Sequence, residues 1–150
     1  VQWALSSFAN RDGARPYIDA AEHLFARAVD DAWNADGAEG LVYTTDWNGT
    51  PVVTDRMHWT AAESLNTAAT LHAATGEARY ANWYATFARY VDEHVIDHEG
   101  GSWFHQLDGD NRVIGTVWPG KSDLYHAFQS TLIPFLDPAV SIATAVRNAA

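Results

Sequence analysis

The chain has 150 residues, of which 47% are hydrophobic, enough for one folded domain with a core and too apolar for a disordered chain. Nineteen acidic against nine basic residues give a net charge of −10, which argues against a nucleic acid or an anionic membrane as partner and favours a neutral small molecule. The sequence has no cysteine, no apolar run long enough to span a membrane and no basic-then-apolar leader, so a cytoplasmic protein is the simplest expectation.

The first predicted elements are a helix and a hairpin. Apolar residues recur at three-then-four spacing over residues 17–33, which is typical of a helix with one buried face. Residues 41–53 alternate as two strands around Asn48-Gly49, a pair that favours a type I′ turn. We expect this hairpin to lie at one end of the helices.

Two further helices follow. Residues 58–74 are rich in alanine and end before Gly76, so they predict an inner helix, because small side chains allow close packing and glycine ends a helix in the left-handed conformation. From about residue 78 to residue 96, tyrosine, tryptophan, phenylalanine and valine again form a stripe at helical spacing. This stripe predicts a second helix with one buried face.

A second hairpin is expected over residues 101–114, with its turn at residues 109–111. Three residues of the first hairpin match three of the second at one constant separation along the chain: Gly40 with Gly101, Tyr43 with Phe104, and Val52 with Val113. The sequence therefore predicts a weak repeat of helix, hairpin and helix. Such units stack side by side, since none buries its apolar face alone.

Two patterns that suggest metal binding are weak. His94 and His98 are four residues apart on a helix, as in some zinc motifs,. Against this, Val91 and Val95 define the buried face, His98 falls at the helix end, and no third ligand is marked,. The Asp108-Gly-Asp110-Asn111 segment opens like a calcium loop but lacks the glutamate at its twelfth position,. We therefore expect a turn there, and no metal site.

The inner helix carries a polar face. Trp59 and Glu63 are four residues apart and share that face with Asn66 and Thr70,. A carboxylate on a water-free face is costly unless it is paired or serves a cavity, and Arg56 or a ligand hydroxyl could be its partner. The alternative is that Glu63 lies on an exposed face.

A third helix is expected to begin near Ser122. Ser122 is a suitable N-cap, and Asp123 is favoured at the positive end of the helix. Asp123, His126 and Ser130 lie on one face, opposite leucine and phenylalanine residues. His126 in the first turn is thus a candidate proton-transfer group, the alternative being a surface or capping histidine.

Four segments of the chain resemble one family. They are Arg56-Met-His-Trp59 with Glu63; Thr75-Gly76-Glu77 with Tyr80; Ile96-Asp97-x-Glu99-x-Gly101-Ser-Trp103; and Trp118-x-Gly120-Lys121-x-Asp123-x-Tyr125-His126-x-x-Gln129-x-x-Leu132-Ile133-Pro134. They resemble the N-acylglucosamine 2-epimerase family, and within it the branch of mannose and sulfoquinovose isomerases. The resemblance covers residues 17 to about 137, and the last segment is the most specific.

The resemblance implies an all-α fold with small β-hairpins, an arc of an α/α toroid of six helical hairpins. Family members move a proton between C1 and C2 of an open-chain sugar through an enediolate, without a redox cofactor. His126 matches the second of two catalytic histidines in the family. Trp59 and Glu63 match residues that line the sugar pocket, and Asp123 lies beside the catalytic position, so a monosaccharide is the expected ligand.

The first family histidine precedes a Glu-Trp pair. If Trp3 is that tryptophan, Gln2 replaces the glutamate and the histidine lies outside this sequence. We therefore expect residues 1–150 to be the C-terminal portion of a single α/α-barrel domain. It should have little activity alone, because an enediolate mechanism needs an acid and a base that each contribute about 10²–10⁴ in rate.

Three other functions remain open. A glycoside hydrolase on the same toroid would need two carboxylates about 5–9.5 Å apart, for which Glu63 and Asp123 are candidates. A 2-epimerase for an N-acylated or disaccharide sugar would use the same residues, and a non-catalytic sugar-binding fragment would use them only for binding. The apolar faces of a partial toroid also favour self-association, so a homo-oligomer is possible.

Overall fold

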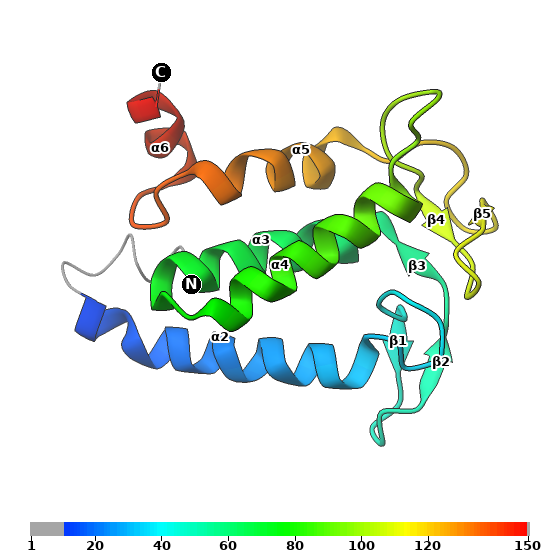
Figure 1. The fold of residues 1–150 in the computed structure, drawn as a ribbon, viewed down its shortest axis with the longest axis horizontal. Helices are drawn as coiled ribbons and strands as arrows, with labels where there is room; N and C mark the ends of the chain where they lie inside the picture. Colours follow the sequence, from blue (N-terminus) through cyan, green and yellow to red (C-terminus); the bar gives the residue numbers. More distant parts are fainter. Residues whose placement is uncertain (1–10, 150) are drawn as a thin grey trace.

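The computed structural model describes residues 11–149 as mostly helical with two small sheets (Figure 1). The interpretation of Gln2 and Trp3 lies outside the described residues. The elements in chain order are α2 (Arg11–Ala32), β1 (Thr44–Thr45), β2 (Pro51–Val53), β3 (Arg56–Met57), α3 (His58–Thr75), α4 (Ala78–Tyr90), the π-helical η1 (Val91–Val95), β4 (Gln106–Leu107), β5 (Val113–Ile114), α5 (Leu124–Leu132), the 3₁₀-helical η2 (Ile133–Phe135) and α6 (Ile142–Ala149).

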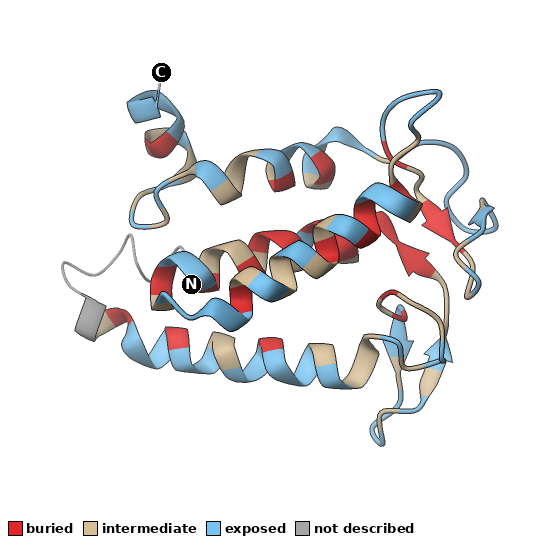
Figure 2. Ribbon diagram, in the orientation of Figure 1, coloured by how far each residue is buried: buried red, intermediate tan, exposed pale blue. Residues whose placement is uncertain are grey.

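Helix α3 is the inner helix that the alanine-rich segment predicts. Its small and aliphatic side chains are buried along its length, and it packs against α2, α4 and α5 (Figure 2). It ends at Gly76, which takes φ 75° and donates its N–H to the carbonyl of His72 at 2.8 Å. Both the crowded position and the glycine stop are confirmed.

The flanking helices α2 and α4 each bury one face, as predicted. Helix α2 begins at Arg11, ahead of the predicted start, because its first turns are polar and carry no apolar stripe. Beyond Tyr90 the second helix widens into η1, where the N–H of Ile96 reaches back to the carbonyl of Val91 at 2.9 Å. The apolar spacing did not indicate this π-helical turn.

The first hairpin lies at one end of the helices (Figure 1), but its turn is not of type I′. That type needs positive φ at both central residues, and here Gly49 has φ 82° whereas Asn48 is not left-handed. Asp46 closes the loop instead: its carboxylate accepts the N–H groups of Asn48 at 2.8 Å and Thr50 at 2.9 Å.

The second hairpin repeats this turn chemistry. The carboxylate of Asp108 accepts the N–H groups of Asp110 and Arg112, both at 2.9 Å, and Asn111 takes the left-handed position with φ 62°. The expected turn is therefore found. Helix, hairpin and helix thus occur twice, as α2 to α3 and as α4 to α5.

Strand β3 distinguishes the second hairpin from the first. It pairs with β4 to give a three-stranded sheet in the order β3-β4-β5, with Met57 opposite Gln106. This short strand, which the sequence interpretation did not include, ties the second hairpin to the start of α3. Within residues 11–149, no helix is long and apolar enough to cross a membrane.

Candidate active site

The start of α3 meets the second hairpin. Because β3 pairs with β4 and runs directly into α3, the N–H of His58 donates to the carbonyl of His105 at 3.2 Å. The two imidazole rings lie 4.6 Å apart between centroids, at 77° to each other. The His58 side chain is fully buried.

The start of α5 reaches the same place. The N-cap is Asp123, whose carboxylate accepts the N–H of His126 at 3.2 Å, so the expected cap at Ser122 is wrong. Ser122 donates its own N–H to the carbonyl of Trp103 at 2.9 Å, and this bond fixes it in the loop before the helix. The other oxygen of Asp123, Oδ2, lies 3.3 Å from Nε2 of His58.

His126 and Glu63 form a hydrogen-bonded pair between α5 and α3. Nδ1 of His126 lies 2.9 Å from Oε1 of Glu63. An ionised carboxylate can only accept, so Nδ1 carries the hydrogen, and in a neutral ring Nε2 is then the acceptor. The His126 side chain is 29% exposed, so the pair is partly covered and still accessible to a ligand from solvent.

The surroundings of Glu63 differ from expectation. Its side chain is 52% exposed and borders a groove that α2, α3 and α5 line together, whereas we expected a water-free face. Arg56 is not its partner: that guanidinium forms a bidentate pair with Asp36 at 2.7 and 2.8 Å. Glu63 is instead paired with the histidine that the sequence singled out.

Aromatic rings form a wall next to these groups. Trp59 contacts Tyr43, His105 and Trp118 edge-on, with centroids 5.7, 5.8 and 6.1 Å away. His105 stacks on Trp118 at 5.5 Å and 23°, and Trp118 is 47% exposed. Flat, partly exposed rings of this kind suit the apolar faces of a small polar ligand.

Gln106 holds the loop that carries Trp118. Its fully buried amide donates to Asp55 at 2.5 Å and to Thr116 at 3.1 Å. Its carbonyl oxygen accepts the backbone N–H groups of Val117 at 3.0 Å and Trp118 at 3.1 Å. One side chain therefore fixes the loop against the sheet.

Burial and neighbouring groups set the charges of the site. Burial lowers the pKa of His58 below its ordinary value, and nearby His105 adds to this, while Asp123 acts in the opposite direction. Burial opposes ionisation of Asp123, but the N–H of His126 and the His58 ring together hold its pKa below the usual value. At neutral pH, His58 is neutral and Asp123 is ionised.

The rest of the polar face on α3 lines the groove. Asn66 and Thr70 lie there with Glu63 and with Gln129 of α5, around a volume of about 580 Å³. The amide of Asn66 is buried and makes no hydrogen bond. Glu63, Asn66 and Thr70 therefore share one face of α3, as predicted, and this face runs along the helix away from the aromatic wall.

The structure brings four residues together where α3 and α5 begin: Trp59, Glu63, Asp123 and His126. These four residues were expected from the sequence to belong to one site. The structure adds three residues that the interpretation did not assign: His58, His105 and Trp118. The signal for His58 and His105 was weak, because the strand that joins their segments, β3, has only two residues. Trp118 opens the most specific family segment, but no role was assigned to it.

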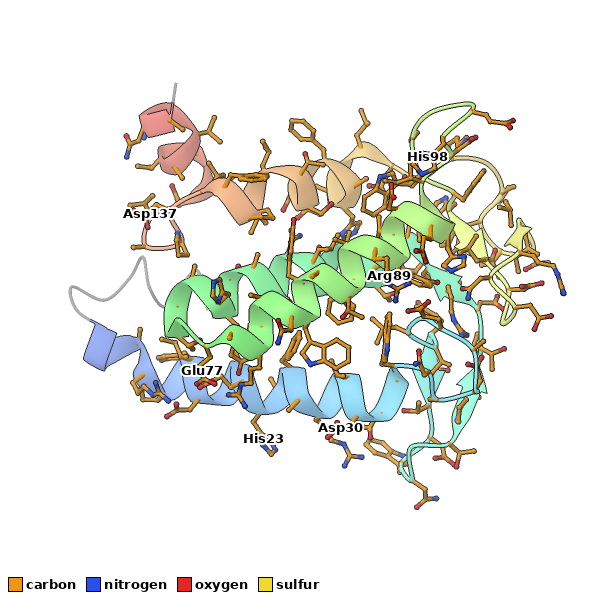
Figure 3. All side chains as sticks on the ribbon, viewed as in Figure 1. His23, Asp30, Glu77, Arg89, His98 and Asp137 are labelled. Atoms are coloured by element: carbon orange, nitrogen blue, oxygen red, sulfur yellow. The ribbon has the colours of Figure 1, made fainter. Side chains whose placement is uncertain are left out.

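Within the described part of the chain, two clusters contain enough ligands for a metal ion: His58 with His105 and Asp123, and Glu39 with Glu93 and His94. His98 belongs to neither. It lies in the loop after η1 (Figure 3), where Nε2 is 2.8 Å from the carbonyl of Asp92. The His94/His98 pair therefore does not converge on one point.

The chain stacks helix-hairpin-helix units and gathers ionisable and aromatic residues at the hairpin end. It is therefore a helical-repeat protein with a polar site beside its hairpins. Among solved structures, a D-mannose isomerase matches 89% of this chain with a TM-score of 0.76 and 29% identity. The cellobiose 2-epimerase of Spirochaeta thermophila shares the fold over 82% of the chain, with a TM-score of 0.59 and 24% identity.

Sequence comparison identifies the family. The N-acylglucosamine 2-epimerase (GlcNAc 2-epimerase) family matches residues 1–130, and the chain belongs to it. It is 47% identical over 131 residues to the D-mannose isomerase of Pseudomonas cannabina pv. alisalensis and 46% identical over 129 residues to that of Thermobifida fusca. These alignments cover 87% and 85% of this chain but 32% of each relative, so the chain spans about a third of their length.

Proposed function

We propose that the chain contributes one side of the active site of an aldose–ketose isomerase that interconverts mannose and fructose. In this proposal, residues 1–150 form the C-terminal portion of a single (α/α)6-barrel domain. The observation that carries it is the pair of His126 and Glu63 at 2.9 Å, beside Asp123 and the Trp59 wall. The identity of 47% to a D-mannose isomerase supports the choice of sugar.

The chemistry follows from the tautomer of His126. With Nδ1–H held by Glu63, Nε2 of the neutral ring accepts the proton of the C2 hydroxyl and returns it to the C1 oxygen. A base outside this chain removes the C2 hydrogen as a proton and delivers it to C1. The two transfers convert the C1 aldehyde and C2 alcohol into a C1 alcohol and C2 ketone through an enediolate, with atoms and charge balanced.

The remaining residues hold the ligand. The open-chain sugar lies against the ring of Trp59, as aromatic faces favour. A carboxylate has two oxygens, so Glu63 orients His126 with one and accepts a sugar hydroxyl with the other. Asp123 is ionised and accepts a hydroxyl from the sugar while it caps α5.

The test uses the full-length protein with D-mannose, followed by NMR. Wild type should form fructose, and His126→Ala should lose about 10²–10⁴ in rate, the usual contribution of a positioned acid–base group. The matched control is His23→Ala, because His23 is exposed on the outer side of α2, far from the site (Figure 3). Near-normal turnover by His126→Ala would refute the assignment.

The same measurement, repeated with an oligosaccharide as a second substrate, separates the alternatives. Glucose formed from mannose would indicate 2-epimerisation, and new reducing ends from an oligosaccharide would indicate hydrolysis. Sugar binding without any exchange of products would indicate a binding protein. Each of these results would replace the proposed isomerisation.

A further inference from the structure

His58, His105 and Asp123 form a compact group of potential metal ligands. One nitrogen of each histidine and one carboxylate oxygen all lie within 4.8 Å of one another. The group combines three chain segments, because the imidazoles come from the start of α3 and from the second hairpin while the carboxylate caps α5. Two histidines and one carboxylate are a ligand set that Zn²⁺ and similar ions take in proteins.

The His58 ring supplies a second, independent observation. Its side chain is fully buried, yet neither Nδ1 nor Nε2 makes a hydrogen bond. The Asp123 oxygen 3.3 Å away lacks the alignment of a hydrogen bond. Buried polar groups are nearly always satisfied, so the ring of His58 has free donor and acceptor capacity for a ligand beside Asp123.

The geometry fits a tetrahedral ion. Zinc bonds of about 2.0–2.2 Å at tetrahedral angles put neighbouring ligand atoms about 3.3–3.6 Å apart. Nε2 of His58 and Oδ2 of Asp123 are separated by 3.3 Å. His105 would complete the set with a ring nitrogen that lies within 4.8 Å of both atoms, and the half-exposed Asp123 leaves the site open to solvent.

We propose that His58, His105 and Asp123 bind one divalent transition-metal ion of the Zn²⁺ class, and that the bound ion inhibits the enzyme. The ion would be an inhibitor and not a cofactor. It would take the Asp123 carboxylate and the His105 ring away from the sugar beside Trp59. The binding stands on the ligand geometry alone, while the inhibition rests on the proposed function.

The second cluster provides a matched control. Glu39 and Glu93 are both paired with Arg89, a cation on α4 that Figure 3 labels, and the Glu93 contact is 2.7 Å. A guanidinium that already neutralises both carboxylates opposes a second cation there. We therefore expect His94→Gln to leave metal binding unchanged.

The test is isothermal titration of zinc chloride into the full-length protein. Wild type should bind one zinc ion. His105→Gln and Asp123→Asn should each weaken binding at least about tenfold, since even the loss of an outer partner of a metal ligand costs that much. Asparagine also caps helices, so Asp123→Asn should keep α5, and thermal unfolding checks that each variant is folded. Magnesium chloride should not bind, because Mg²⁺ prefers oxygen ligands.

Three results would overturn the metal site: no zinc binding by wild type, unchanged binding by both ligand variants in folded form, or loss of binding in His94→Gln. In the mannose assay, zinc should abolish turnover and EDTA should restore it, whereas full turnover with zinc bound would refute the inhibition. If the protein converts no sugar at all, the proposed function fails, and the titration still decides the metal site.

Discussion

His58 and His126 are close neighbours with different roles. Their ring centroids lie 5.9 Å apart, but His58 is buried against the second hairpin while His126 is partly exposed and hydrogen-bonded to Glu63. The spacing of residues along α5 predicted that His126 shares one face of the helix with Asp123. No pattern in the sequence distinguished His58 from an ordinary residue before Trp59, because its environment comes from β3 and β4.

The buried state of His58 predicts a pH-dependent stability. Its pKa in the folded protein lies below the value of 6.5 of an unfolded histidine, so below about pH 6.5 the unfolded chain gains a proton that the folded chain resists. The free energy of unfolding should therefore fall as the pH drops through this range. Wild type should lose more of it between pH 7.5 and 5.5 than His58→Asn does.

Urea denaturation at the two pH values measures this difference. The control for the loss of one histidine is His23→Asn, because His23 is exposed. An identical pH dependence for wild type and His58→Asn would show that the His58 pocket does not resist protonation.

The loop between β5 and α5 is held by one side chain. Gln106 makes four hydrogen bonds that join β4 to Asp55, Thr116 and the backbone before Pro119. Trp118 in this loop stacks on His105 and contacts Trp59. Gln106 is therefore a positioning residue that acts on the site through Trp118.

Gln106→Met tests this role, since it keeps the length of the side chain and removes its polar atoms. Lost loop positioning should raise the KM for mannose more than it lowers kcat. Trp118→Ala should have a similar effect, and the double variant should be little worse than Trp118→Ala alone, because both changes remove one interaction. Additive effects in steady-state kinetics would show that Gln106 does not act through Trp118.

The elements were predicted unevenly, for physical reasons. Helices α2 and α4 repeat their apolar pattern over several turns, and the alanine-rich composition and Gly76 marked α3, so all three were found. The turn at Asn48-Gly49 was misassigned because the Asp46 carboxylate, two residues before Asn48, stabilises a different loop. Strand β3 has two residues and η1 has five, so both are too short to leave a periodic signal.

At the scale of the whole molecule, helix α5 has an unusual orientation. Its small residues Ala127 and Ser130 are buried, whereas Leu124 and Phe128 are 79% and 59% exposed. A helix of a monomeric domain buries its large apolar side chains. In the proposed barrel, this exposed side would be covered by the part of the domain that the chain, at about a third of its relatives' length, does not include.

The central claim is that the His126 site isomerises a sugar by proton transfer. The most direct measurement is NMR of D-mannose with the full-length protein in D₂O. Fructose should form, with deuterium at C1 to the extent that the base exchanges its proton with solvent before delivering it. His126→Ala should lose about 10²–10⁴ in rate while His23→Ala keeps the wild-type rate. No fructose at all, or unchanged turnover by His126→Ala, would contradict the account.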